Sequence, residues 1–417
     1  MPWLPQHASV AALQHRNFRL LWLGTLVSMA GSMMRQTALL WQVSLLVPAD
    51  QKALALGGVG LMRFVPVVVC SLFAGVAADA FDRRRVMLLT NGALGLISAA
   101  LALLTSSGTA TLGSVYLLAA LTAAVGTFDN PARNALFPSL LPREALANAI
   151  SLNSILFQAA AVTGPLLGGV LIATHGVGLV YLCDALSFVV LLGSVWAIEV
   201  PAAQAQAPRA KVELRSIWAG FAFVFGRPLI RSSMLLDFFA TFFASSTTLL
   251  PIFAQDVLRV GAHGYGLLSA ATAVGAVLTS LTLAAIVEHI EQRGRVLVSS
   301  VVVYGVVTAA FGVSRVFWLS FLFLMLSGAA DTVSTVLRNV LRQLETPDEL
   351  RGRMTSVNMM FFMGGPQLGE VEAGLVAQRF GPVVAVVTGG VGCVLAAVWL
   401  ALRTPSLLRY RRAVIAG

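Results

Sequence analysis

Long apolar runs fill most of the chain, and short polar segments separate them. Each run is close to or above the roughly 20 residues that cross a bilayer as an α-helix. The runs lack the short alternation of a membrane β-barrel, so we interpret them as helices, whose backbone groups bond within the helix. The pattern predicts twelve membrane-spanning helices, near residues 20–47, 54–78, 86–106, 112–134, 147–173, 178–198, 229–254, 264–288, 296–314, 316–340, 354–378 and 381–402.

The composition indicates the same class of protein. Hydrophobic residues are 58% of the 417 residues, charged residues only 11%, and the mean hydropathy is +0.85. A soluble domain carries about 25% charged residues, so this composition excludes a soluble fold and a disordered chain. The net charge of +10 is expected to orient the chain in a lipid bilayer and not to bind nucleic acid. Three cysteines within apolar runs are interpreted as packing residues without a metal: Cys70, Cys183 and Cys393.

Basic residues gather in alternate loops. One set of loops carries most of the Lys and Arg residues, including Arg16, residues 83–85 and Arg293. The other set carries only Lys52, Arg259, Arg315 and Arg379. Because basic loops stay on the cytoplasmic side of the membrane, we predict that both termini are cytoplasmic.

The two halves of the chain resemble each other. PREALANAISLN at 142–153 aligns with PDELRGRMTSVN at 347–358, and GPLLGG at 164–169 aligns with GPQLGE at 365–370. Repeats of six helices are typical of transporters whose substrate path runs between the repeats. The alignment predicts an all-α fold with two six-helix bundles related by a pseudo-two-fold axis.

The longest polar break divides these bundles. We predict an N-terminal bundle over residues 1–198, a cytoplasmic linker over 199–228 and a C-terminal bundle over 229–417. Apolar residues at helical spacing near 214–225 indicate either an interfacial helix in the linker or an early start of the seventh span.

Polar and charged residues inside the apolar runs are the candidate functional groups. A charge at the centre of a bilayer costs about 2.5–3.5 kcal/mol even on the mildest scale, so such residues are seldom accidental. Polar stripes predict that spans 1, 5, 7, 10 and 11 line a wet path and that spans 3, 9 and 12 face lipid. The alternative is that the stripes only hold helices together. Asp184, near the outer end of its span, is interpreted as structural. The candidates for proton coupling or substrate binding are Arg35, Arg63, Asp237, Asp331, Gln367, Glu370 and Glu372.

The connection between the second and third spans reads GVAADAFDRRR. An acid at a helix end beside a basic cluster can form ion pairs that break and re-form as a protein changes state. We predict a conformational latch made of Gly75, Asp79, Arg83, Arg84, Arg85, Asp129 and Arg133. The alternative is that the basic residues only anchor the loop on the cytoplasmic side.

Taken together, these motifs resemble the major facilitator superfamily over nearly the whole chain. GVAADAFDRRR resembles the superfamily's motif between spans two and three, although Ala80 replaces a basic residue and Asp82 replaces a glycine. GPLLGG resembles the antiporter motif of the fifth span, with Ala160 in place of its first glycine, and implies export by exchange. The motif residues here are Gly164, Pro165, Gly168 and Gly169.

Other segments are similar to the twelve-span drug–proton antiporter branch of that superfamily. They are AGSMMRQTALLWQV at 30–43, FDNPARNALFPSLLPREALANA at 128–149 and ELRGRMTSVNMM at 349–360. This branch includes enterobactin-exporter-like, macrolide-efflux-like and other transmembrane secretion effector proteins, and GPQLGEVEAG at 365–374 is similar to siderophore-exporter-like members. The resemblance implies a bacterial inner membrane protein driven by the proton gradient, without a cofactor.

The function expected is export of a small molecule, drug-like or a siderophore, by proton antiport through alternating access. Protonation removes a charge from a dehydrated site and so changes which state is favoured. Asp237 and Glu370 are the first candidates to bind the proton, and Glu372 is the next. Arg35 and Arg63 are expected to bind an anionic substrate group or to adjust a carboxylate.

Two kinds of alternative remain. An importer or uniporter of the same fold differs only in its coupling. A membrane-embedded enzyme, a scaffold or a sensor is less compatible with the sequence, because the five histidines have no metal-ligand spacing and no soluble output domain is readable. No ATP-binding loop GxxxxGK[ST] is present, so we expect a secondary transporter and not an enzyme. We expect the chain to be a monomer.

Overall fold

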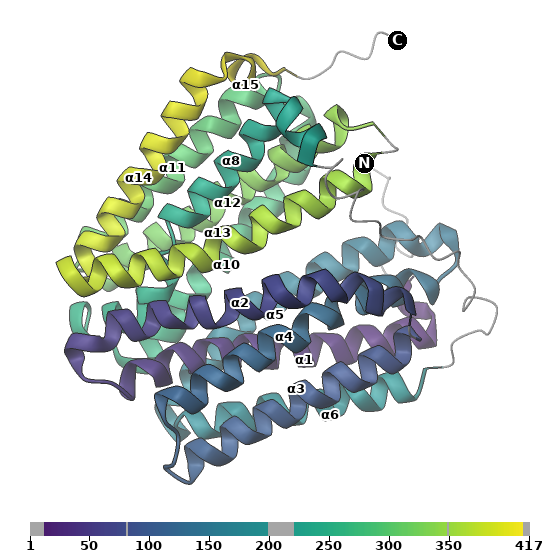
Figure 1. The fold of residues 1–417 in the computed structure, drawn as a ribbon, viewed down its shortest axis with the longest axis vertical. Coiled ribbons are helices and arrows are strands. Elements are labelled where there is room, and N and C mark those ends of the chain that lie inside the picture. The colour runs from purple at the N-terminus through teal and green to yellow at the C-terminus, as the bar shows by residue number, and fades with distance from the viewer. Residues whose placement is uncertain (1–11, 81, 199–220, 348–349, 412–417) are drawn as a thin grey trace, which may run out of the picture. The chain divides into compact units, whose positions relative to one another are not determined.

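The computed structural model describes residues 12–80, 82–198, 221–347 and 350–411, and these are mostly helical (Figure 1). The chain forms two compact units: residues 1–42 with 62–212, and residues 43–61 with 213–417. The predicted all-α fold is confirmed. Of the predicted linker with its interfacial helix, residues 199–220 lie outside the described residues.

The first unit contains six helices in chain order, of which the first two run partly into the second unit. They are α1 (Arg16–Leu45), α2 (Lys52–Ala80), α3 (Arg83–Ser106), α4 (Leu112–Ser139), α5 (Leu146–His175) and α6 (Val177–Trp196). Asp82 caps α3, because its Oδ1 accepts a bond from the backbone N–H of Arg85 at 2.9 Å.

The second unit repeats this order with one interruption. Its helices are α8 (Pro228–Phe243), α9 (Leu250–Ile252), α10 (Gly261–Ile286), α11 (Arg293–Val313), α12 (Phe317–Glu345), α13 (Arg351–Phe380), α14 (Pro382–Arg403) and the short α15 (Pro405–Arg409). The predicted seventh span, 229–254, is not one regular helix. After Phe243 it continues as a 3-10 turn, the short α9 and a π-helix over Phe253–Val257. Ala244 and Ser245 leave the helical region with ψ of 29° and 53°, which ends the α8 hydrogen-bond ladder.

Corresponding helices pack in the same way inside each unit. In the first unit α3 lies against α6 and α4, and in the second unit α11 lies against α14 and α12. The turns correspond as well: Gly176 joins α5 to α6 and Gly381 joins α13 to α14, with φ of 83° and 90°. Glycine adopts this left-handed region without the steric cost of a side chain. The internal repeat read from sequence is therefore present in the packing.

Ten helical segments among the described residues are long and apolar enough to cross a membrane. The other two long helices, α1 and α13, contain Arg35 and Glu370 respectively. Helix α3 exposes a stripe of leucines seven residues apart, Leu89, Leu96 and Leu103, while Asn91 and Ser98 are buried. The prediction that the third span faces lipid therefore fits only one face of α3, because its opposite face carries buried polar groups.

Residues 43–61 are fastened inside the second unit by polar contacts. Lys52 Nζ donates to Gln255 Oε1 at 2.8 Å and forms an ion pair with Asp256 at 3.2 Å. Gln378 on α13 donates to the carbonyl of Asp50 at 2.5 Å. These contacts hold residues 50–52 against the π-helix over Phe253–Val257 and against α13, both distant in sequence.

Candidate functional site

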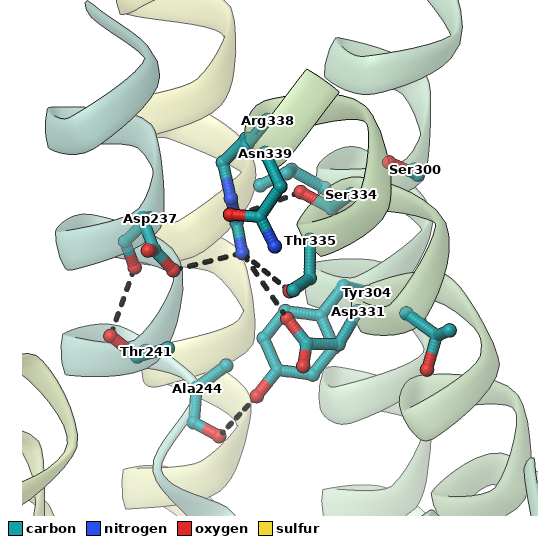
Figure 2. Close-up of polar contacts among 12 residues, drawn as sticks. Asp237, Thr241, Ala244, Ser300, Tyr304, Asp331, Ser334, Thr335, Arg338 and Asn339 are labelled. Atoms are coloured by element: carbon teal, nitrogen blue, oxygen red, sulfur yellow. Dashed lines mark hydrogen bonds and ion pairs between the residues drawn. The ribbon is translucent and has the colours of Figure 1, made fainter. Parts of the chain in front are cut away.

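A cluster of four ionised side chains lies inside the second unit. We call it the Arg338 cluster: Asp237 on α8, with Asp331, Arg338 and Arg342 on α12 (Figure 2). Arg338 Nη2 lies 2.9 Å from Asp237 Oδ1 and 3.7 Å from Asp331 Oδ1. Arg342 Nη1 lies 4.0 Å from Asp237 Oδ2. One guanidinium is therefore shared between two carboxylates.

The register of α12 builds this cluster. Asp331, Arg338 and Arg342 are separated by seven and four residues, so they share one face of the helix. Ser334 and Thr335 lie between them and accept bonds from Arg338 Nη1 and Nη2, both at 2.8 Å. Each terminal nitrogen of Arg338 thus has a partner on its own helix, which holds the guanidinium toward α8.

The two carboxylates of the cluster differ in how deeply their side chains are buried. The side chains of Asp237 and Arg338 are 3% and 1% exposed, whereas that of Asp331 is 44% exposed. Buried charges persist only when they are paired, because an uncompensated charge in a medium of low dielectric constant is costly. Asp237 and Arg338 therefore require each other, and Asp331 is the carboxylate of the cluster whose side chain is accessible at the surface of this unit.

Two further helices border the cluster, α11 with Tyr304 and α14 with Cys393. The Tyr304 hydroxyl donates to the carbonyl of Ala244 at 3.3 Å, and Thr241 on α8 donates to the carbonyl of Asp237 at 2.9 Å (Figure 2). Cys393 is buried. The cluster therefore has a phenol and a thiol as neutral neighbours on these two helices.

The first unit has an ion pair of its own. Arg35 Nε on α1 donates to Asp184 Oδ2 on α6 at 2.7 Å, and Ser98 on α3 donates to the same oxygen at 2.6 Å. Two turns further along α1, Gln42 joins the same three helices, since it accepts from Tyr181 at 2.7 Å and donates to Thr105 at 2.8 Å. Buried polar contacts thus hold α1, α3 and α6 together at two levels.

Both units bury an ion on their first long helix. These ions are Arg35 on α1 and Asp237 on α8. Ser98 donates to the carboxylate of the first centre, whereas Ser300 on α11 donates to the carbonyl of Leu297 on its own helix at 2.8 Å. The first long helices of the two units therefore carry buried ions of opposite sign.

The predicted latch residues fall into several separate contacts. Asp129 is buried and accepts from Thr90 at 2.9 Å and from Asn91 at 2.6 Å, and it pairs with Arg133 on its own helix. Arg84 binds the carbonyls at the end of α6, of Val195 at 3.0 Å and of Trp196 at 2.6 Å. Of the other predicted members, Arg83 is half-buried and Arg85 exposed. Gly75 and Asp79 lie in α2, at positions whose surroundings are outside what the structure describes.

The remaining predicted site residues lie on α2 and α13. Arg63, Gln367, Glu370 and Glu372 are all half-buried. A Cβ at Gly60 on α2 would lie 2.9 Å from Glu370 Oε2, so the missing side chain allows this carboxylate to approach α2.

The glycines of the GPLLGG motif bring two helices close together. A Cβ on Gly164 would meet the side chain of Met33 and would lie 2.9 Å from the carbonyl of Ala30, so α5 packs directly on α1. Gly168, Gly169 and Pro165 are buried in the same helix. In the second unit Gly365 and Gly369 pack on α8 in the same way.

Sequence reasoning assigned the polar stripes to a wet path, and burial divides those stripes. On α1, Thr25, Ser28 and Arg35 are buried while Gln36 is exposed, and on α8 Ser233 and Asp237 are buried. Arg35 and Asp237 pair with charged side chains of other helices in their own unit. Ser233 instead donates to the carbonyl of Ile230 on its own helix. Helical spacing gives a shared face but not what covers it, so the wet path stays a prediction.

The two guanidinium groups of the cluster, Arg338 and Arg342, are not identified from the sequence. A signal was present, because two arginines follow Asp331 at helical spacing within an apolar run. Asp184 was expected to be structural, and it forms the ion pair with Arg35. No group of three metal-ligating side chains exists among the described residues.

Comparison with known proteins extends over nearly the whole chain. Residues 7–409 match the family model described as transmembrane secretion effector. An enterobactin exporter of Citrobacter koseri is 28% identical over 95% of this chain and 94% of its own. Enterobactin exporters of Shigella boydii and Escherichia coli are each 27% identical with the same coverage.

Solved structures share the fold. A bacterial homolog of the human lysosomal transporter Spinster superposes with a TM-score of 0.75 at 15% identity, covering 95% of this chain and 99% of that one. A bacterial homologue of the iron transporter ferroportin gives 0.71 at 16% identity, covering 95% and 99%. Since the family match spans almost the whole chain, the protein belongs to the transmembrane secretion effector family of the major facilitator superfamily, a family of membrane transporters and not of enzymes.

Proposed function

We propose that this protein exports a small molecule of the siderophore type from a bacterial cell in exchange for protons. The enterobactin exporters that resemble it over 94% of their own length support this class of substrate. The bias of basic residues toward one set of loops supports an inner-membrane location with both termini in the cytoplasm. The proton gradient is the proposed driving force, without a cofactor, and the proposed working unit is a monomer.

The observation that carries the coupling proposal is the shared guanidinium of Arg338. In the ionised cluster two carboxylates balance two guanidinium groups. A proton that reaches Asp331, the exposed carboxylate, leaves Arg338 to Asp237 alone and gives the cluster one net positive charge. A net charge within a membrane-embedded unit is costly, so protonation changes the relative free energies of two conformations.

In this scheme each carboxylate has one task. Asp331 binds the proton, and Asp237 keeps Arg338 in place throughout the cycle. Glu370, Glu372 and Gln367 on α13 are further candidates for binding protons or substrate. Alternating access through the two repeats converts the change in free energy into transport.

The test uses purified protein in proteoliposomes loaded with enterobactin or a fluorescent drug. With an imposed proton gradient, the wild type should move substrate against its concentration difference. Asp331→Asn should keep downhill exchange but lose the response to the gradient, at least tenfold. Glu291→Gln, which changes an exposed carboxylate of the same unit, is the matched control and should behave as wild type.

Two results would contradict the proposal. Transport by the wild type that ignores the proton gradient would exclude antiport and favour a uniporter. Full gradient dependence in Asp331→Asn would exclude Asp331 as the proton site. Asp237→Asn and Glu370→Gln, measured in parallel, would then show which other carboxylate responds.

A further inference from the structure

Arg35 uses only part of its hydrogen-bonding capacity. Its Nε donates to Asp184, and among the described residues neither terminal nitrogen has an acceptor. The side chain is nevertheless nine-tenths buried, with 10% of its surface exposed. The two terminal nitrogens of this buried arginine therefore keep their N–H groups available as hydrogen-bond donors.

The carboxylate that holds Arg35 is also incompletely satisfied. Asp184 Oδ2 accepts from both Arg35 and Ser98, whereas Oδ1 is buried and has no donor among the residues that the structure describes. Buried polar atoms are nearly always paired, and an exception calls for an explanation such as a missing ligand. Donor and acceptor capacity therefore remain unused at the same ion pair.

The other buried arginine shows the opposite arrangement. Arg338 directs both terminal nitrogens to Ser334, Thr335 and the carboxylates, and only its Nε has no partner. The two terminal nitrogens of Arg338, the fork of its guanidinium, are thus occupied by protein groups. Arg35 is bound only through Nε, which leaves both nitrogens of its fork available. The fork of a guanidinium matches two oxygens of an anion, such as a carboxylate, in a planar bidentate contact.

We propose that Arg35 is an anion-binding residue of the first unit, positioned by Asp184 and Ser98, and that the cargo carries an anionic oxygen group such as a carboxylate or phenolate. This inference rests on the proposed export function and adds the charge class of the cargo. The Arg338 cluster responds to protons, and Arg35 recognises the anion.

Binding tests this assignment separately from transport. The probes are salicylate, an anion, and salicylamide, its neutral analogue, titrated at pH 6.5 into the full-length protein in phosphatidylcholine nanodiscs, with tryptophan fluorescence or calorimetry as readout. We expect the wild type to bind salicylate at least tenfold more tightly than salicylamide. Arg35→Lys keeps the charge but removes the fork, and should lose most of this preference. Arg19→Lys, on an exposed position of the same helix, should keep it.

A folding defect is addressed by a second variant. Arg35→Gln/Asp184→Asn removes both charges together, so it leaves no unpaired ion, and it should bind the two probes equally. Equal binding of the probes by the wild type, no binding of either probe, or an unchanged preference in both variants would overturn the proposal. Loss of the preference in nanodiscs with phosphatidylglycerol would assign the site to a lipid headgroup and overturn the cargo assignment. Each of these results leaves the proton-coupling test of Asp331 unaffected.

Discussion

On its first long helix the first unit buries an arginine, Arg35, and on its own first long helix the second unit buries an aspartate, Asp237. Arg35 meets one carboxylate, Asp184, whose second contact is a serine hydroxyl. Asp237 meets a guanidinium that a second, exposed carboxylate also approaches. The first long helix thus takes part in a simple pair in one unit and in a four-ion cluster in the other.

The difference shows how a repeat can acquire separate roles without a change of fold. In a pair with both members buried, loss of either charge leaves the other uncompensated, so such a pair is fixed. In the Arg338 cluster, Asp331 can lose its charge while Asp237 and Arg338 stay paired. The first unit is therefore suited to a constant charge pattern and the second to a change of charge.

The largest effect is expected from breaking the cluster at its centre. Arg338→Leu leaves Asp237 buried without its nearest counter-ion, which should lower the free energy of unfolding by about 3–5 kcal/mol. Thermal unfolding of the detergent-purified protein measures the loss. Adding Asp237→Leu should restore most of it, and a single variant as stable as wild type would show that the cluster is not tightly coupled.

A somewhat smaller effect is expected in the first unit. Asp184→Leu leaves Arg35 unpaired, at a cost of about 3 kcal/mol, the lower end of the range for a buried pair, because a tenth of the arginine side chain is exposed. The same unfolding measurement applies. A loss greater than that of Arg338→Leu would reverse the order proposed for the two centres.

Two serines on the corresponding helices α3 and α11 provide a comparison. Ser98→Ala removes a hydrogen bond to a buried carboxylate and should cost about 1.5 kcal/mol. Ser300→Ala removes only a bond to a carbonyl of its own helix and should cost less than about 0.5 kcal/mol. Similar values for both would show that the Asp184 bond contributes little, and comparison of the two melting temperatures decides it.

The smallest effect on stability is expected at Asp331. Its side chain is 44% exposed and lies 3.7 Å from Arg338, so Asp331→Asn should change the free energy of unfolding by less than about 1 kcal/mol. The unfolding curve of this variant should therefore nearly overlay that of the wild type. A loss above about 2 kcal/mol would assign Asp331 a structural role, and the transport assay would then no longer isolate proton binding.

Much of the fold could be read from the apolar runs. Their lengths predict the long helices, and the matched segments predict the repeat, because a bilayer imposes one length and one hydrogen-bonding solution on every span. The irregular stretch after Phe243 was not predictable in this way. The whole segment has the length and hydropathy of a membrane span, although residues 245–248 are all serine or threonine and Pro251 follows. These residues weaken a regular helix, but only the backbone angles reveal the 3-10 and π turns.

The candidate site was predicted only in part. The cost of embedded charges singled out Arg35, Asp237 and Asp331 from sequence. Their partners Asp184 and Arg338 lie 149 and 101 residues away from Arg35 and Asp237 respectively. Spacing along one helix cannot state which side chain of another helix it meets.

The sequence by itself determined that this chain is helical and membrane-embedded and is built as a repeat. It also showed charged side chains within the apolar spans, where a charge is costly. Hydrophobic length, helical periodicity and the cost of burying charge act locally, so they can be read along the chain. Only the tertiary structure decided which ions pair, which arginine keeps its terminal nitrogens unoccupied and which carboxylate lies at the surface of its unit. These properties depend on how helices distant in sequence pack within each unit.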